Sequence, residues 1–159
     1  MKRIIAACAL AGLLSVPAKA DETLKFRNVE HPASNHNQQW MAFGERRFVG
    51  VVRTEGAATF PDGSTSKTLG VGTYDIVVGS GGSVSGYGSL TFADGSELWS
   101  IYTGTLKWGD LKNREIGTAI VVGDKGRYAG ATGNATWEGE ATRGANAVCE
   151  IDNVVNIKK

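Results

Sequence analysis

GRYAGATGNATWEG, residues 126–139, decides the fold of this chain. The stretch directly follows the apolar run Ala119–Val122, which is typical of a buried strand. Glycine adopts positive φ and lets two backbones approach closely. The spacing of the glycines around Tyr128 therefore predicts a forced turn between two strands with the Tyr128 ring buried; the glycines are Gly126, Gly130, Gly133 and Gly139.

Eight segments rich in β-branched and aromatic residues surround this turn, and no window has the period of an amphipathic helix. The predicted strands are Leu24–Val29, Phe48–Thr54, Lys67–Val78, Val84–Phe92, Glu97–Leu106, Glu115–Val122, Ala135–Ala141 and Ala147–Ile157. The pentapeptide Phe-x-Asp-Gly-Ser occurs twice, at residues 60–64 and 92–96, and Asp-Gly between strands favours a hairpin. We predict an all-β fold: a closed antiparallel eight-stranded up-and-down, calycin-like β-barrel, which has no open sheet edges.

The first twenty residues predict a cleaved secretory signal peptide. Lys2 and Arg3 precede an apolar segment at residues 4–16, and Ala18-Lys19-Ala20 is a cleavage site of the A-x-A type. The apolar segment is shorter than the roughly 20 residues that span a bilayer. We therefore expect a single β-barrel domain at residues 21–159, with no membrane insertion after cleavage and a periplasmic or secreted location.

Charge and cysteine content narrow the possible partners. Three of the 17 basic residues and none of the 16 acidic residues lie in the signal peptide, so residues 21–159 carry a formal charge of −2. Nucleic acid is thus not an expected partner. Cys149 is the one cysteine after the signal peptide, which excludes an intrachain disulfide, and we interpret it as a small buried residue of the last strand.

The segment Glu30–Glu45 is polar and aperiodic up to Trp40, and we predict a long loop near one mouth of the barrel. Both histidines, His31 and His36, lie in it. Their spacing is not that of a zinc site, so we expect no metal and no other cofactor. A Ser-His-Asp hydrolase would need this loop to fold over the sheet, and the chain contains none of the usual nucleophile or phosphate-loop motifs.

The glycine-rich turn resembles that of allene oxide cyclase-like and dirigent-like β-barrels, whose segment reads G-G-[RK]-[FY]-x-G-A-x-G. The matching residues are Gly126, Arg127, Tyr128, Gly130, Ala131 and Gly133. The resemblance implies a barrel from about residue 46 to 157 that holds an apolar substrate in its lumen and needs no cofactor. It transfers no catalytic residue to this chain. An ordinary glycine-rich hairpin would use the same residues.

Polar and aromatic residues inside the strands are the candidate site, because alternate positions of a closed barrel face the lumen. We predict Glu97 and Arg53 as catalytic residues. The predicted ligand-binding residues are Tyr74, Tyr87, Trp99 and Glu115. Glu97 and Trp99 share one face of their strand, whereas Tyr102 lies on the other, and either face could also be the solvated one. Asp75 and Tyr102 are further candidates.

Two classes of function follow. One is a cofactor-independent cyclase or isomerase that holds a small apolar ligand in the lumen and stabilises developing charge. The other is a non-enzymatic barrel, which binds an apolar molecule or has a filled lumen and a structural or protein-interaction role. An open cavity with converging polar groups would favour the enzyme. Assembly into a homo-oligomer stays open.

Overall fold

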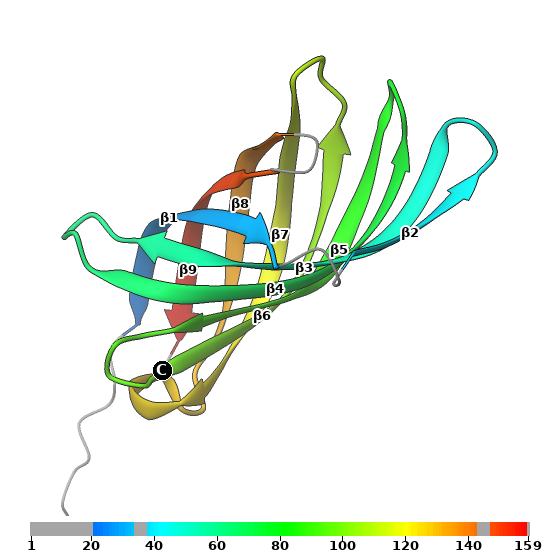
Figure 1. Ribbon diagram of the computed structural model, residues 1–159. Coiled ribbons are helices and arrows are strands. Elements are labelled where there is room, and N and C mark those ends of the chain that lie inside the picture. Colours follow the sequence, from blue (N-terminus) through cyan, green and yellow to red (C-terminus); the bar gives the residue numbers. More distant parts are fainter. Residues whose placement is uncertain (1–20, 34–37, 143–146, 159) are drawn as a thin grey trace, which may run out of the picture.

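Eight antiparallel strands close into a barrel, and a further strand lies outside the ring (Figure 1). The computed structural model describes residues 21–33, 38–142 and 147–158. Its elements are β1 (Glu22–Pro32), β2 (Gln38–Phe43), β3 (Arg47–Thr59), β4 (Thr65–Val77), β5 (Gly81–Thr91), β6 (Glu97–Lys107), β7 (Lys112–Lys125), η1 (Gly126–Tyr128), β8 (Thr132–Thr142) and β9 (Cys149–Lys158). The predicted signal peptide lies outside the described residues. Those residues include no helix of the length and apolarity needed to span a bilayer.

Neighbouring strands of the ring are neighbours in sequence, as predicted for an up-and-down barrel. From β3 to β9 each strand pairs with the next, and β1 closes the ring by pairing with both β9 and β3. Each of the eight predicted strand ranges overlaps one barrel strand. In β1 and β3–β6 the even-numbered residues face the lumen, whereas in β7–β9 the odd-numbered residues do; the alternate residues face solvent, with few exceptions.

The prediction of a long loop at Glu30–Glu45 is wrong in part. Glu30 belongs to β1, and Gln38–Phe43 forms β2. Both strands pair with β3: Pro32 is opposite Thr54, and Gln38 is opposite Val52. One residue of β3, Arg53, lies between these two pairs, and its carbonyl accepts a hydrogen bond from the Ala33 N–H. The partner strand β3 is long enough to hold two successive neighbours, which a reading of local sequence does not reveal.

The partner of β3 changes at Arg53, from β1 on one side of it to β2 on the other. β2 continues along β3 but forms no ladder with β9, whose first residue is already opposite Glu30. The β2–β3 hairpin (cyan) therefore extends outward at the upper end in Figure 1, away from β8 and β9 (orange and red). This end of the barrel is the mouth.

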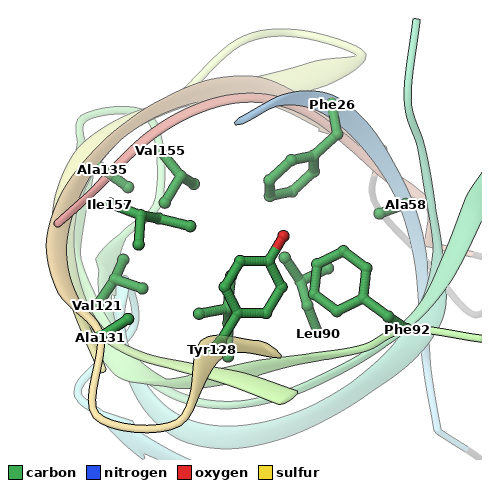
Figure 2. Packing of buried hydrophobic residues seen from close by; sticks show 11 residues of the cluster. Phe26, Ala58, Leu90, Phe92, Val121, Tyr128, Ala131, Ala135, Val155 and Ile157 are labelled. Atoms are coloured by element: carbon green, nitrogen blue, oxygen red, sulfur yellow. The ribbon is translucent and has the colours of Figure 1, made fainter. Parts of the chain in front are cut away.

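The opposite end is closed by η1 and by aromatic residues. Gly126 and Gly130 have φ of 63° and 77°, and the Tyr128 side chain is fully buried, which confirms the predicted turn. The Tyr128 ring lies 5.0 Å from the ring of Phe92, centroid to centroid. Figure 2 shows Tyr128, Phe92 and Phe26 pointing into the barrel together with aliphatic residues of β7, β8 and β9.

The two Phe-x-Asp-Gly-Ser copies fold alike. In each turn the phenylalanine N–H donates to the serine carbonyl, the glycine N–H donates to the phenylalanine carbonyl, and the aspartate accepts from the serine N–H. Gly63 and Gly95 have φ of 82° and 78°, as a three-residue hairpin loop with a bulge requires. The ring centroids of Phe60 and Phe92 lie 5.8 Å apart. Together with Phe26 and Tyr128 they form the aromatic cluster at this end of the barrel, which we call the plug. The repeated motif therefore closes the barrel end as well as turning the chain.

Candidate functional site

Above the aromatic plug the lumen is hollow. A lower cavity of about 120 Å³ lies next to the plug, and an upper cavity of about 370 Å³ lies towards the mouth. The two cavities adjoin, because four residues from four strands line both: Thr54, Tyr74, Glu115 and Cys149. This junction is the candidate functional site.

The walls of both cavities are mostly aliphatic and aromatic. The lower cavity is lined by apolar residues that include Phe26, Val84, Leu90, Leu98, Val121, Trp137 and Val155. The upper cavity is lined by Trp40, Phe48, Val52, Ile76, Leu106 and Trp108, among others. A concave apolar site with a few polar groups is the usual form of a small-molecule site.

Glu115 is the most buried charged residue of the junction. The alternation of β7 points it inward between Asn113 and Gly117, and 4% of the residue is exposed. Among the described residues the carboxylate has no hydrogen bond and no ion pair. Burial, and secondly the negative charge of Glu30, raise the pKa of Glu115 to about 7. Both protonation states are therefore populated near neutral pH.

Glu30 is the second carboxylate of the lumen. Thr54 Oγ1 donates a hydrogen bond to Glu30 Oε2 at 2.7 Å, and Asn28 Nδ2 donates to Oε1 at 3.2 Å. Thr54 thus connects β3 to the carboxylate of β1. These two donors hold Glu30 in place as a hydrogen-bond acceptor.

Two tyrosines supply hydroxyl groups. Burial raises the pKa of Tyr74 and of Tyr102 far above the ordinary value, and the charges of Glu30 and Glu115 raise both further. Both phenols therefore stay protonated and can donate hydrogen bonds to a ligand. The Tyr74 ring lies 6.1 Å from that of Trp40, and the Tyr102 ring lies 6.1 Å edge-on from that of Trp137.

Space for Tyr102 comes from glycines of the adjacent strands. Gly72, Gly86 and Tyr102 are opposite one another in β4, β5 and β6. A Cβ atom at Gly72 would lie 2.5 Å from the Tyr102 hydroxyl oxygen, and one at Gly86 would lie 2.7 Å away. The phenol lies over this glycine row, which leaves the barrel hollow where side chains would otherwise fill it.

Cys149 contributes a thiol at the junction. It is half-buried at the start of β9 and is a free cysteine. Burial, with the charges of Glu115 and Glu30, raises its pKa to about 12. The thiol therefore stays protonated and is a poor nucleophile.

Of the six predicted site residues, Tyr74 and Glu115 lie in the lumen. The prediction that Glu97, Arg53 and Tyr87 face the lumen is wrong, because these three alternate with the inward-facing residues of β6, β3 and β5 and point outward. Trp99 lies partly exposed on β6 and also lines the lower cavity. Tyr87 is 59% exposed and Trp99 is 43% exposed. Glu97 Oε1 lies 3.8 Å from Lys125 Nζ, an outer ion pair. Among the further candidates, Tyr102 points inward and Asp75 pairs with Arg47 outside.

The prediction failed for some site residues because both faces of β5 and β6 contain bulky residues. Local alternation therefore did not indicate which face was buried, and closure of the ring decided it. Glu30 was missed because its segment was interpreted as a loop. The alternation of residues in β1 could have identified Glu30, because Leu24, Phe26 and Glu30 lie on the same face of the strand.

His31 lies exposed on the outer face of β1, one position from Glu30, and His36 lies outside the described residues. Within residues 21–33, 38–142 and 147–158, no group of three or more His, Cys, Asp or Glu side chains is placed to hold a metal ion. The acidic pair in the lumen is thus separate from the imidazole of His31.

A comparison with protein-family models found no match for the chain, and a comparison with curated proteins found none either.

Proposed function

We propose that this protein binds a small, largely apolar molecule in the barrel lumen. The observation that carries the proposal is the pair of adjoining cavities, with apolar walls and a few polar groups at the junction. The mouth gives access to the upper cavity, and the aromatic plug closes the other end. A ligand would exchange contact with water for contact with these walls, which favours binding.

Binding of the neutral fluorescent probe N-phenyl-1-naphthylamine tests this proposal. Ser100 lines the lower cavity on β6, whereas Thr103 of the same strand is exposed on the outer face. Ser100→Phe should reduce probe binding by filling the lumen, and Thr103→Phe should leave it unchanged. Equal binding by both variants, with native circular dichroism spectra, would show that the probe does not occupy the lumen.

A second candidate is a cofactor-independent isomerase or cyclase in which Glu115 transfers a proton. Its pKa of about 7 favours this role, because a general acid or base works best when its pKa is near the operating pH. The protonated phenols of Tyr74 and Tyr102 would stabilise negative charge on a substrate oxygen. The resemblance of the glycine-rich turn to allene oxide cyclase-like barrels supports the same class.

The substrate 5-nitrobenzisoxazole tests the proton-transfer role. A carboxylate takes its C3 proton, the N–O bond breaks with its electron pair going to oxygen, and coloured 2-cyano-4-nitrophenolate is released. The rate should rise with pH through an inflection near 7 and should be lost in Glu115→Gln. Glu138→Gln removes an exposed outer carboxylate and is the control. An unchanged rate in Glu115→Gln would exclude Glu115 as the base.

We also propose export to the periplasm or the medium, with the mature chain starting at Asp21. The support is the arrangement of basic, apolar and small residues in positions 1–20. The intact mass of protein recovered from the periplasmic fraction checks this. A mass that includes residues 1–20 would contradict it.

A further inference from the structure

The cavity walls contain carboxylates without a positive charge to match them. Glu30 and Glu115 are the charged side chains among the described lining residues of both cavities, and no lysine, arginine or histidine is in that set. Buried carboxylates are normally paired, because desolvation strongly disfavours an isolated charge. Glu115 is 4% exposed and has no partner among the described residues.

Buried acceptor atoms without partners line the same cavities. Asn28 Oδ1 faces the lower cavity and Asn113 Oδ1 faces the upper one, each without a hydrogen bond in the described structure. Trp137 Nε1 is the corresponding buried donor. Together with the Glu115 carboxylate, these amide oxygens leave acceptors in the lumen that a ligand with N–H groups could satisfy. An unpaired buried polar atom destabilises the folded protein until something satisfies it.

Aromatic side chains line the same cavities as these carboxylates. Tyr74 and Tyr102 reach the junction from β4 and β6, with Trp40 and Trp137 packed beside them. The negative face of an aromatic ring attracts an organic cation, most strongly where water is excluded. Anionic side chains, unpaired acceptors and aromatic walls would therefore all interact favourably with one kind of ligand, an organic cation.

We propose that the lumen binds a hydrophobic organic cation, with its ammonium group at the junction beside Glu115 and Glu30 and its apolar body along the cavity walls. This inference rests on the proposed function and specifies the ligand class. An ammonium group supplies several N–H donors and the missing positive charge at once. An anionic ligand would instead bring a third negative charge towards two desolvated carboxylates.

The proposal predicts the direction of a pH effect. The titratable groups that face Glu115 are Glu30 on β1, Tyr74 on β4, Tyr102 on β6 and Cys149 on β9. The two phenols and the thiol stay neutral around pH 7, whereas Glu115 ionises there. Cation binding should therefore strengthen as pH rises through 7. A ligand that accepts a hydrogen bond from protonated Glu115 would show the opposite trend.

Three probes with one apolar body test the proposal by isothermal titration calorimetry: 4-phenylbutylamine, 4-phenylbutanol and 4-phenylbutanoate. At pH 8 the amine should bind about tenfold more tightly than the alcohol, since a charged hydrogen bond replaces a neutral one. The carboxylate should bind most weakly. The preference for the amine should shrink several-fold at pH 6, where Glu115 is mostly protonated.

Variants assign the preference to its residue. Glu115→Gln should lose most of the preference for the amine over the alcohol, together with its pH dependence near 7, while Glu138→Gln should behave as wild type. Glu30→Gln keeps Glu115 and should reduce the preference for the amine in part. It replaces Glu115→Gln as the test if that variant does not fold. Equal affinities for the alcohol and the amine at pH 8 would overturn the cation inference, and so would tighter binding of the amine at pH 6 than at pH 8. Either result would leave the proposal of lumen binding intact. Failure of all three probes would overturn both.

Discussion

Glu115 has an environment that is unfavourable for a carboxylate. The residue is 4% exposed, and the charge that raises its pKa beyond the effect of burial is that of a second carboxylate, Glu30. A carboxyl group whose folded pKa lies above its unfolded value stabilises the protein at low pH. That contribution is complete below the unfolded pKa and is lost as pH rises through the folded one. Burial of the Glu115 carboxylate therefore lowers the free energy of unfolding near neutral pH.

We predict that Glu115→Gln is more stable than wild type at pH 8 and that this advantage disappears near pH 5. The folded protein retains the Glu115 proton up to about pH 7, whereas the unfolded chain releases it near 4.5. The folded state thus binds more protons in this window, and its stability falls as pH rises, by on the order of 3 kcal/mol at most. Urea denaturation of both proteins at pH 5 and 8 measures the difference. Parallel pH profiles would contradict the prediction.

Gly130 lies at a turn where the backbone has φ of 77°. A Cβ atom there would contact nothing within 4 Å, so any effect of substitution is conformational. Gly130→Val should lower the free energy of unfolding by about 1–3 kcal/mol, because a β-branched residue strongly disfavours positive φ. Gly130→Asn should be milder, since asparagine tolerates this region. Thermal denaturation checks the order; equal melting temperatures for both variants and wild type would refute it.

At the scale of elements, two similar turns and η1 together form the plug. Phe60, Phe92 and Tyr128 are far apart in sequence, and their rings are in contact inside the barrel. The Arg127 guanidinium lies over both the Phe92 and Tyr128 rings, at 4.7 and 4.9 Å from their centroids. The plug belongs to the hydrophobic core and is separate from the mouth where a ligand would enter.

Phe92→Ala should lower the free energy of unfolding by about 3–5 kcal/mol, because it leaves a cavity in the buried aromatic cluster. Phe43→Ala removes the same side chain from an exposed site on β2 and should change stability by no more than about 0.5 kcal/mol. Guanidinium denaturation of the two variants measures the contrast. Similar effects for both would show that the plug contributes little to stability.

At the scale of the whole molecule, the change of partners along β3 gives the barrel two unlike ends. Trp40 of β2 is opposite Gly50 of β3, and its ring lines the upper cavity beside Tyr74. The added strand therefore extends the cavity wall beyond the closed ring. We interpret β2 as part of the binding site.

Trp40→Ala should weaken binding of N-phenyl-1-naphthylamine severalfold, because it removes apolar contact area at the mouth. Tyr87→Ala is the control: Tyr87 is an aromatic residue on the outer face of β5 that is 59% exposed and lines neither cavity. It should leave the affinity unchanged. Fluorescence titration of both variants tests this, and equal losses would contradict the assignment of the lumen as the binding site.

The chain itself determined the all-β class, the eight barrel strands and the turns between them. These properties depend on local signals: alternation of residue types, Asp-Gly turns and glycines at positive φ, as at Gly130. Two of the site residues, Tyr74 and Glu115, could also be predicted, because polar residues inside strands were few enough to name. For Tyr102 the same reasoning identified the residue but not its direction.

Only the tertiary structure decided which face of each strand is inside. An alternating strand with Trp99 and Ile101 on one face and Leu98 and Tyr102 on the other has no local preference, and closure of the ring removes the ambiguity. The position of Glu30 was likewise decided by strand pairing, since β3 has two successive partners. The pKa of Glu115 is a tertiary property as well, because the burial and the neighbouring charge that raise it come from strands distant in sequence.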